Sequence, residues 1–229
     1  MEKVINGILY SSIDFAGSPT YFVVKSCFKN DAVVHIESEI DGCPIQIIDE
    51  RAFFKNNFLE EIEIPDTVYR INIQAFWGCS LLKTVKVYKS NLEVKMSSIS
   101  IGSEAFCNCR SLNSIETDKL IQLNGQMIFH NCFELENLNK DNVLVGSIYS
   151  MDFYNCIALR KLKVIGQRCR LWTDCFKATD NLETIIFDCR HVQAPKSVMR
   201  LLNKRKILCS SSCNLADLIY SGANVQFID

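Results

Sequence analysis

The chain has 229 residues, of which 48% are hydrophobic and 22% charged, so it is long and apolar enough to bury a core and is not a disordered tail. Its formal net charge of −1 excludes a general polyanion-binding surface. Nine glycines and four prolines are too few for a fibrous or low-complexity protein.

Residues 1–47 are predicted to form a strand-rich N-terminal cap. Strand-like runs occur at Ile8–Ile13, Tyr21–Phe28 and Val33–Ile36. The first ten residues lack a basic start with a long apolar stretch behind it, and the sequence has no window of 18 apolar residues. We therefore predict neither a signal peptide nor a membrane span. This favours a cytoplasmic protein of a reducing compartment, which would reach a cell surface only by a non-classical route.

Residues 48–188 hold six copies of a repeat. The copies are marked by Phe53, Phe76, Phe106, Phe129, Phe153 and Phe176, at spacings of 23, 30, 23, 24 and 23 residues. Six residues after each phenylalanine stands a leucine, and three residues further an aliphatic residue. The one long spacing places an insertion within residues 88–100. A period of about 23 residues predicts a solenoid, because one coil cannot bury its own apolar face but stacked coils bury one another.

Each coil is predicted to contain one strand and one helical turn. After Leu59, apolar and polar residues alternate as far as Ile64, which is typical of a short strand with one buried face. Strands of successive coils are then expected to pair about 4.8 Å apart in one parallel sheet. Opposite this sheet lie Ala-Phe pairs such as Ala52-Phe53. We expect a helical turn there, with each phenylalanine stacked on that of the next coil.

These positions form the pattern I-x-x-x-A-F-x-x-C-x-x-L-x-x-I-x-I-P-x-x-V-x-x-I, which resembles that of BspA-type leucine-rich repeats. Ile48–Ile71 is a nearly complete copy, with Asn56 in place of the cysteine. The resemblance spans about residues 33–187 and implies a right-handed leucine-rich repeat coil, mostly β or α/β in class, with a parallel sheet, six repeats and two caps in one structural domain. The resemblance also implies the role of a surface antigen or adhesin that binds host or matrix proteins.

Residues 189–229 lose the repeat and are predicted to form a C-terminal cap. We expect helices at Val198–Leu202 and Leu215–Tyr220 and a last strand at Asn224–Ile228. The cap also carries a basic run, made of Lys196, Arg200, Lys204, Arg205 and Lys206. We interpret this run as the solvent-exposed side of the cap. The alternative is a basic amphipathic helix for an anionic membrane or a nucleic acid.

Twelve cysteines raise the question of metals or disulfides. Four share one column of the repeat, namely Cys79, Cys109, Cys132 and Cys156. We predict that these are reduced, buried thiols that pack like apolar residues. Neither the cysteines nor His35, His130 and His191 form a zinc or catalytic motif, and His130 is expected to face solvent. With no other catalytic or phosphate-binding motif, we predict no enzyme, no cofactor and no metal site.

The outward positions of the predicted strands are the best candidates for contacting a partner. They are Glu61, Glu63, Lys86, Tyr88, Glu116, Asn139, Lys161 and Lys163. Among them Lys86, Glu116, Asn139 and Lys163 are predicted to form one row, about 15 Å long by strand spacing, with the 88–100 insertion as a lateral wall. Mixed charge without an aromatic row favours a protein over a glycan or a nucleic acid. The alternative is that the row only pairs with itself.

The sequence therefore predicts a monomeric, non-catalytic module that binds a protein partner and no nucleic acid. Through the resemblance, its setting is that of a surface antigen or adhesin. The alternative is an intracellular scaffold or adaptor that uses the same sheet face. An enzyme is a third class, for which the sequence offers no residue.

Overall fold

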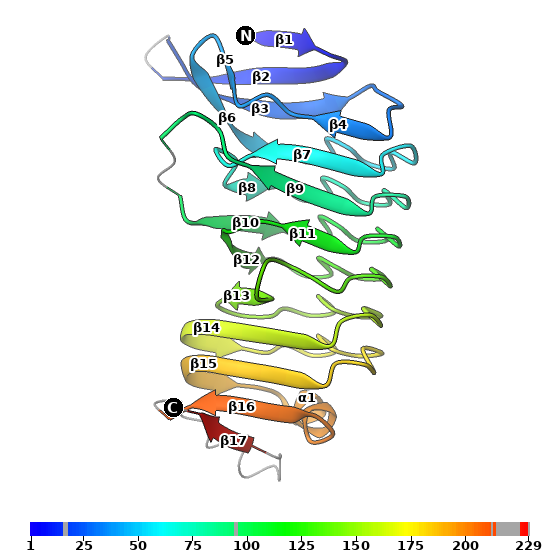
Figure 1. Cartoon of the computed structure of the whole chain (residues 1–229), viewed down its shortest axis with the longest axis vertical. Coiled ribbons are helices and arrows are strands. Elements are labelled where there is room, and N and C mark those ends of the chain that lie inside the picture. Colours follow the sequence, from blue (N-terminus) through cyan, green and yellow to red (C-terminus); the bar gives the residue numbers. More distant parts are fainter. Residues whose placement is uncertain (16–17, 94–95, 212, 214–224, 229) are drawn as a thin grey trace.

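The computed structural model describes residues 1–229 apart from 16–17, 94–95, 212, 214–224 and 229. The described chain winds around one long axis as a stack of coils (Figure 1). Within these ranges the sole α-helix is α1 (Lys196–Leu202). The predicted solenoid with a parallel sheet and repeats of about 23 residues is confirmed. We number its coils 1 to 6 by the phenylalanines Phe53 to Phe176.

The N-terminal strands start antiparallel and then become parallel. They are β1 (Glu2–Ile5), β2 (Ile8–Phe15), β3 (Ser18–Cys27), β4 (Val33–His35), β5 (Glu39–Ile40) and β6 (Cys43–Ile48). The first three form antiparallel pairs, and β3 then pairs in parallel with β6. The three strands predicted in this segment are confirmed as β2, β3 and β4. The switch at β6 starts the coil, because every later strand of this sheet pairs in parallel with the strand before it.

A long sheet runs the length of the solenoid. After β6 it contains β8 (Arg70–Ile71), β10 (Ser98–Gly102), β12 (Leu120–Asn124), β13 (Val143–Val145), β14 (Lys161–Arg170), β15 (Thr184–Gln193), β16 (Lys206–Ser210) and β17 (Val225–Ile228). In coils 1 to 3 its strands come from the end of the repeat, which was not predicted to be a strand. Ile48, Ile71 and Ile101 lie in register in this sheet and are buried in the core. Burial of this isoleucine column explains why the end of the repeat forms strands of the long sheet.

The predicted strands of the Leu-x-x-Ile-x-Ile segments form a separate, short sheet. It consists of β4, β7 (Glu61–Pro65), β9 (Thr84–Tyr88) and β11 (Ser114–Glu116), all parallel, in the order β11-β9-β7-β4. The prediction of one continuous sheet is wrong at coil 4, where Asn137 makes only an isolated bridge to Ser114. In coils 5 and 6 the same segment begins the strands β14 and β15 of the long sheet.

The Ala-Phe segments are pairs of tight turns, and the predicted helical turn is wrong. Two residues before and two residues after each phenylalanine the backbone has positive φ, as at Arg51 (57°) and Lys55 (55°) around Phe53. Alternation of right- and left-handed conformations directs the N–H groups of Arg51, Phe53 and Lys55 toward the next coil. Their acceptors are the carbonyls of Ile73, Ala75 and Trp77, at 3.2, 2.8 and 2.8 Å. A helix would use such N–H groups within its own segment.

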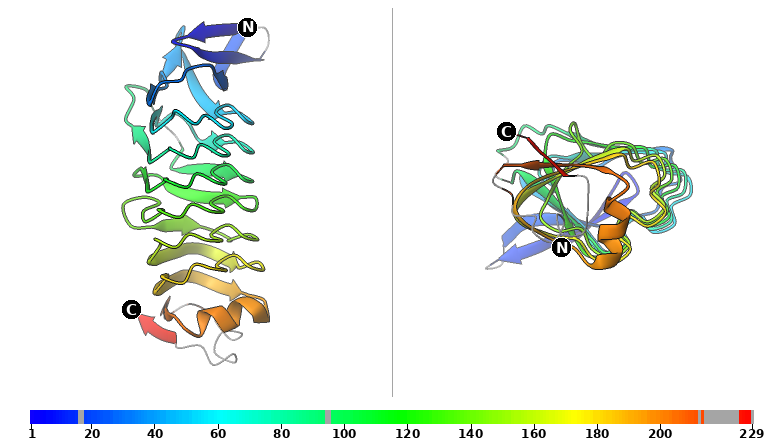
Figure 2. Two further views of the ribbon diagram at one scale, coloured as in Figure 1. Left: turned by 90° about the vertical axis from the view of Figure 1, so that its right-hand side faces the viewer. Right: turned by 90° about the horizontal axis from the view of Figure 1, so that it is seen from below.

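Glycine or asparagine often occupies the second left-handed position, as these residues tolerate it best. The positions are Gly78, Asn108, Asn131 and Asn155. The same bonds between turns recur from coil to coil. In the next coil, for example, the Phe76 N–H donates to the Ala105 carbonyl at 2.8 Å. Seen along the solenoid axis, the turns of successive coils nest on one side (Figure 2).

The predicted phenylalanine stack is confirmed. Phe53, Phe76, Phe106, Phe129, Phe153 and Phe176 lie ring on ring, with centroids 5.0, 5.1, 5.6, 5.6 and 6.0 Å apart along the series. All six are buried. Such stacking adds to the hydrophobic gain of burying each ring, so the column is the centre of the core.

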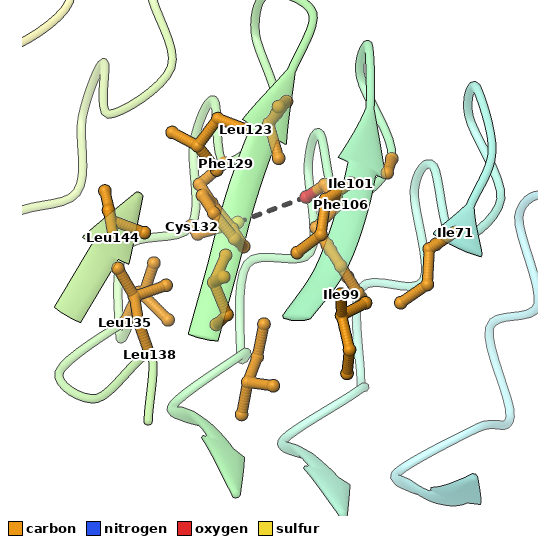
Figure 3. Packing of buried hydrophobic residues seen from close by; sticks show 14 of the residues in the cluster. Ile71, Ile99, Ile101, Phe106, Leu123, Phe129, Cys132, Leu135, Leu138 and Leu144 are labelled. Atoms are coloured by element: carbon orange, nitrogen blue, oxygen red, sulfur yellow. Dashed lines mark hydrogen bonds between the residues drawn. The ribbon is translucent and has the colours of Figure 1, made fainter. Parts of the chain in front are cut away.

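The cysteine column is buried beside the phenylalanines, as predicted. Each thiol donates to the carbonyl of the phenylalanine in the preceding coil, and Figure 3 shows this bond from Cys132 to Phe106 at 3.1 Å. Cys79, Cys109 and Cys156 make the same bond at 3.0, 3.0 and 3.1 Å. Burial raises the pKa of Cys132 well above its ordinary value. The twelve cysteines all lie in the described part of the chain and form no disulfide, and the thiols of this column are shielded from solvent.

The C-terminal cap seals coil 6 with α1 and one buried arginine. The helix predicted at Val198–Leu202 is confirmed, and the predicted strand at the C-terminus is β17; Leu215–Tyr220 lies outside the described residues. Arg205, which was assigned to the exposed basic run, is instead buried. Its guanidinium donates to the carbonyls of Leu182 and Thr179, both at 2.9 Å. The side chain is drawn inward because it supplies donors for carbonyls at the end of the stack.

Asp152 replaces the alanine of the repeat and is fully buried. Its carboxylate accepts hydrogen bonds from the backbone N–H of Tyr149 at 2.7 Å and of Ile128 at 3.2 Å. Desolvation outweighs these bonds and raises the pKa of Asp152 to about 7. The folded protein therefore holds a proton on this carboxyl group at pH values where the unfolded chain, with an ordinary pKa of about 4, has lost it.

We expect Phe106→Ala to lower the free energy of unfolding by about 3–5 kcal/mol, as large-to-small substitutions in tightly packed cores do. Phe58→Ala is the matched control, because Phe58 is 54% exposed and should change stability by only about 0.5 kcal/mol. Urea unfolding followed by circular dichroism measures both values. Equal effects of the two substitutions would contradict the stacked core.

We expect the stability of the protein to fall as pH rises from about 4 to 7, since folding then requires proton uptake by Asp152. Asp152→Asn removes the titrating group, so the stability difference between the variant and the wild type should shift in favour of the variant through this window. Thermal unfolding at a series of pH values tests this. Asp180→Asn, at an exposed aspartate, should follow the wild-type profile; a parallel profile for Asp152→Asn would contradict the assignment.

Candidate functional site

The short sheet brings five of the predicted residues onto one outward face. Glu61 and Glu63 lie on β7, Lys86 and Tyr88 on β9, and Glu116 on β11. Between them Ile62, Ile64, Val85 and Ile115 are buried, so the period-two alternation turns the other residues outward. Glu63, Lys86 and Glu116 are directly opposite one another in the register. We call these five residues the sheet face.

The charges of the sheet face pair only in part. Lys86 Nζ donates to Glu61 Oε1 at 2.7 Å, and this bond, together with the charges of Glu116 and Glu63, raises the pKa of Lys86. His35 Nδ1 lies 3.0 Å from Glu63 Oε2. Glu116 makes no ion pair within the described part of the chain. Three carboxylates against one ammonium leave the face acidic, so self-pairing accounts for only part of its charge.

Tyr88 forms a fixed corner of the sheet face. Its hydroxyl donates to the carbonyl of Ile36 at 2.7 Å, and its ring stacks on His35 with centroids 4.8 Å apart. Burial raises the pKa of Tyr88 to about 12, with a further contribution from nearby carboxylates such as Glu37. The insertion begins at this corner, where Asp66 accepts hydrogen bonds from the N–H and hydroxyl of Ser90 at 3.0 and 2.6 Å.

Asn139 does not face outward, contrary to prediction. Its side chain is buried and organises a loop. The amide oxygen accepts hydrogen bonds from the N–H of Val143 at 2.8 Å and of Asp141 at 3.2 Å, while the amide nitrogen donates to the Val143 carbonyl at 2.7 Å. Asn139 was expected on a strand, but the hydrogen bonds of its side chain to the backbone of Asp141 and Val143 favour the loop instead.

Lys161 and Lys163 belong to a different surface from the sheet face. Both lie on β14, and in Figure 1 a loop separates this strand from β11. Lys163 is paired in register with Val143 rather than with Asn139, because the residues after Leu138 form a loop and β13 begins only at Val143. Lys163 also lies 3.3 Å from the carboxylate of Asp188. The predicted row from Lys86 to Lys163 is therefore not formed.

A cavity of about 550 Å³ occupies the place where the short sheet stops. Val87, Ile115 and Thr117 contribute to its wall, Glu116 and Asp118 supply negative charge, and Lys140 supplies one positive charge. The cavity lies beside the outer edge of β11. It was not predicted, because it results from the loop of coil 4 rather than from any residue of the repeat.

A row of side chains on the turn side contains two stacked aromatic pairs, Phe54–Trp77 and His130–Tyr154, which were not predicted. It arises from the position after each repeat phenylalanine, which holds Phe54, Trp77, Cys107, His130, Tyr154 and Lys177. Phe54 stacks on Trp77 at 5.0 Å, with Lys55 Nζ 5.4 Å from the Trp77 ring. Reading this column of the repeat in the sequence would have identified the row.

His130 is half-buried in this row and does not face solvent as expected. Its ring stacks on Tyr154 with centroids 4.7 Å apart, and its buried Nδ1 atom has no hydrogen-bond partner among the residues that the structure describes. Burial lowers the pKa of His130, which favours the neutral ring. The ring therefore acts as a packing surface between coils.

The chemistry of the sheet face suits contact with another molecule's surface. Its carboxylates, ammonium and phenol lie on paired strands and are at least partly exposed, and within the face Lys86 pairs with Glu61. Among the described residues no three potential ligands of the His, Cys, Asp and Glu types are grouped for a metal ion. In the same part of the chain no helix has the length and apolar character needed to cross a membrane.

Comparison with known proteins supports the fold. The sequence matches the BspA type leucine rich repeat region in six copies, over residues 46–97 and 86–198. No curated protein matches it. A solved leucine-rich repeat protein of T. pallidum is 17% identical, with a TM-score of 0.66 over 99% of this chain and 98% of its own. A leucine-rich repeat protein from Bacteroides capillosus is 21% identical, with a TM-score of 0.46 over 61% of this chain and 98% of its own.

We expect Asn139→Ala to destabilise the protein by about 1–3 kcal/mol, because it leaves partly buried backbone groups of Asp141 and Val143 without partners. Asn137→Ala is the matched control two residues away, at an exposed side chain, and should be nearly neutral. Chemical unfolding measures both. A neutral Asn139→Ala would show that the loop does not depend on this amide.

Proposed function

Because the chain belongs to the BspA-type leucine-rich repeat family, we propose that it is a non-catalytic protein-binding module whose sheet face contacts the partner. Leucine-rich repeat proteins generally bind other proteins. The observation that carries the proposal is the set of three carboxylates on a rigid strand surface, facing one ammonium. Side chains fixed by a parallel sheet present charge at little entropic cost on binding.

The acidic character of the sheet face defines the partner's chemistry. A protein surface with exposed lysine or arginine complements it, whereas a nucleic acid or another polyanion is repelled. Such complementarity mainly raises association rate and specificity, and it weakens with salt. Binding of the proposed partner is therefore salt-sensitive.

For the biological setting, our proposal is a surface antigen or adhesin that binds host or matrix proteins. Membership of the family supports it. The alternative is an intracellular scaffold or adaptor that uses the same face. Surface biotinylation of intact cells distinguishes the two, because a membrane-impermeant reagent labels only protein that lies outside the cell.

We expect Glu61→Lys/Glu63→Lys to weaken binding of a purified partner by at least about tenfold, since it reverses the charge of the face. Glu50→Lys/Glu134→Lys is the control with the same change in net charge at exposed residues elsewhere. Titrations at two salt concentrations measure both variants, after circular dichroism has shown that they fold.

Unchanged affinity in the sheet-face variant would contradict the proposal. If affinity is instead lost when Lys196, Arg200 and Lys204 are neutralised, the partner binds the exposed basic side of the C-terminal cap. That outcome would replace the sheet face as the binding surface.

A further inference from the structure

The outer edge of β11 carries two backbone groups without a partner. On this edge Ile115 N–H donates to the Asn137 carbonyl at 2.9 Å, and Asn137 N–H donates to the Asn113 carbonyl at 3.1 Å. Asn137 therefore bridges the groups before and after its register partner Ser114, which is how a parallel strand pairs. The next step of the same ladder would use the Ile115 carbonyl and the Thr117 N–H. Neither group is hydrogen-bonded within the described residues.

Asn139 is the residue that would form the missing step of the ladder if coil 4 continued as a strand. In a continued strand Asn139 would bridge the Ile115 carbonyl and the Thr117 N–H, opposite Glu116. Instead, its backbone enters the loop of coil 4, where Leu138 N–H donates to Asn142 Oδ1 at 2.7 Å. The ladder is thus interrupted by local side-chain bonds, and β11 keeps an open position for one strand residue. Unpaired edges of this kind are where added strands bind.

The cavity of about 550 Å³ lies beside this open position. Its size is within the range of ligand sites and accommodates a few residues of an extended chain. A residue that bridges Ile115 and Thr117 lies opposite Glu116, and in a parallel strand its side chain points to the same side as Glu116. Glu116 and Asp118 are both exposed and acidic, against the single cation of Lys140.

We propose that the edge of β11 binds an extended, basic peptide segment of a partner protein as an added parallel strand. One residue of the segment donates its N–H to the Ile115 carbonyl and accepts a hydrogen bond from the Thr117 N–H. The side chain of that residue is lysine or arginine and contacts Glu116. This inference rests on the proposed function, protein binding by the short sheet, and specifies the partner's chemistry and its mode of attachment.

The probe is an acetylated and amidated nine-residue peptide in which lysine alternates with valine. In an extended strand alternate residues direct their N–H groups to opposite edges. We expect N-methylation of every lysine to weaken binding by at least about tenfold, because the one lysine that bridges Ile115 and Thr117 then has no N–H to donate. N-methylation of the valines is the matched control and leaves binding within about twofold, since those N–H groups face away. Fluorescence titration of the labelled peptides measures this.

Two measurements on the protein complete the test. Hydrogen exchange of the Thr117 amide is expected to slow when the peptide binds, because the N–H gains an acceptor. Glu116→Lys/Asp118→Lys is expected to weaken binding of the peptide by at least about tenfold, while Glu50→Lys/Glu134→Lys leaves it unchanged. Thr117 exchange that does not respond to bound peptide would overturn the proposal, as would equal binding of the two N-methylated peptides.

The outcomes also separate this inference from the proposed function. If a purified partner depends on Glu61 and Glu63 but the peptide neither binds nor protects Thr117, the edge proposal fails and the proposed function stands. If the peptide protects the Thr117 amide from exchange but the partner's affinity is unchanged by Glu61→Lys/Glu63→Lys, the proposed function fails instead. Protection of Thr117 that grows with protein concentration in the absence of peptide would identify a second copy of this chain as the occupant and overturn the proposal.

Discussion

The hydrogen bonds between successive Ala-Phe turns hold the coils of this protein in register. Left-handed residues two positions before and after each phenylalanine direct alternate N–H groups to the carbonyls of the next coil. Because this connection recurs along the stack, the phenylalanine rings lie directly above one another and the cysteine thiols reach the carbonyls of the preceding coil. The two sheets flank this stack of turns, and their strand ladders are less regular than the turns, with an interruption at coil 4.

Where the strands depart from the repeat, buried polar groups replace the regular ladder. Asn139 closes the loop of coil 4, Asp152 accepts two N–H groups of the neighbouring backbone, and Arg205 supplies donors at the end of the stack. Each is buried because backbone groups would otherwise lack partners in the core. The loop of coil 4 has the largest effect on the surface, since it separates the acidic sheet face from the lysines of β14 and leaves the edge of β11 open.

The column of phenylalanines and the column of cysteines could be predicted, because fixed spacing places equivalent residues at equivalent points of every coil. The same argument correctly placed Glu61, Glu63, Lys86, Tyr88 and Glu116 outward on neighbouring strands. It failed for Lys163, although Lys163 has the right position within its repeat. Pairing follows the path of the backbone, and the loop after Leu138 shifts that path before β13 begins.

The solenoid, its period and its core follow from the amino-acid sequence alone, because these depend on the periodic burial of apolar side chains. The construction of the turns and the burial of particular polar residues follow only from the folded chain. Hydrophobic spacing is the same for a helical turn and for two tight turns, whereas the bonds to the next coil favour the latter. Likewise, the burial of Asn139 and Arg205 depends on which backbone groups remain unpaired around them, and that is fixed only when all coils are stacked.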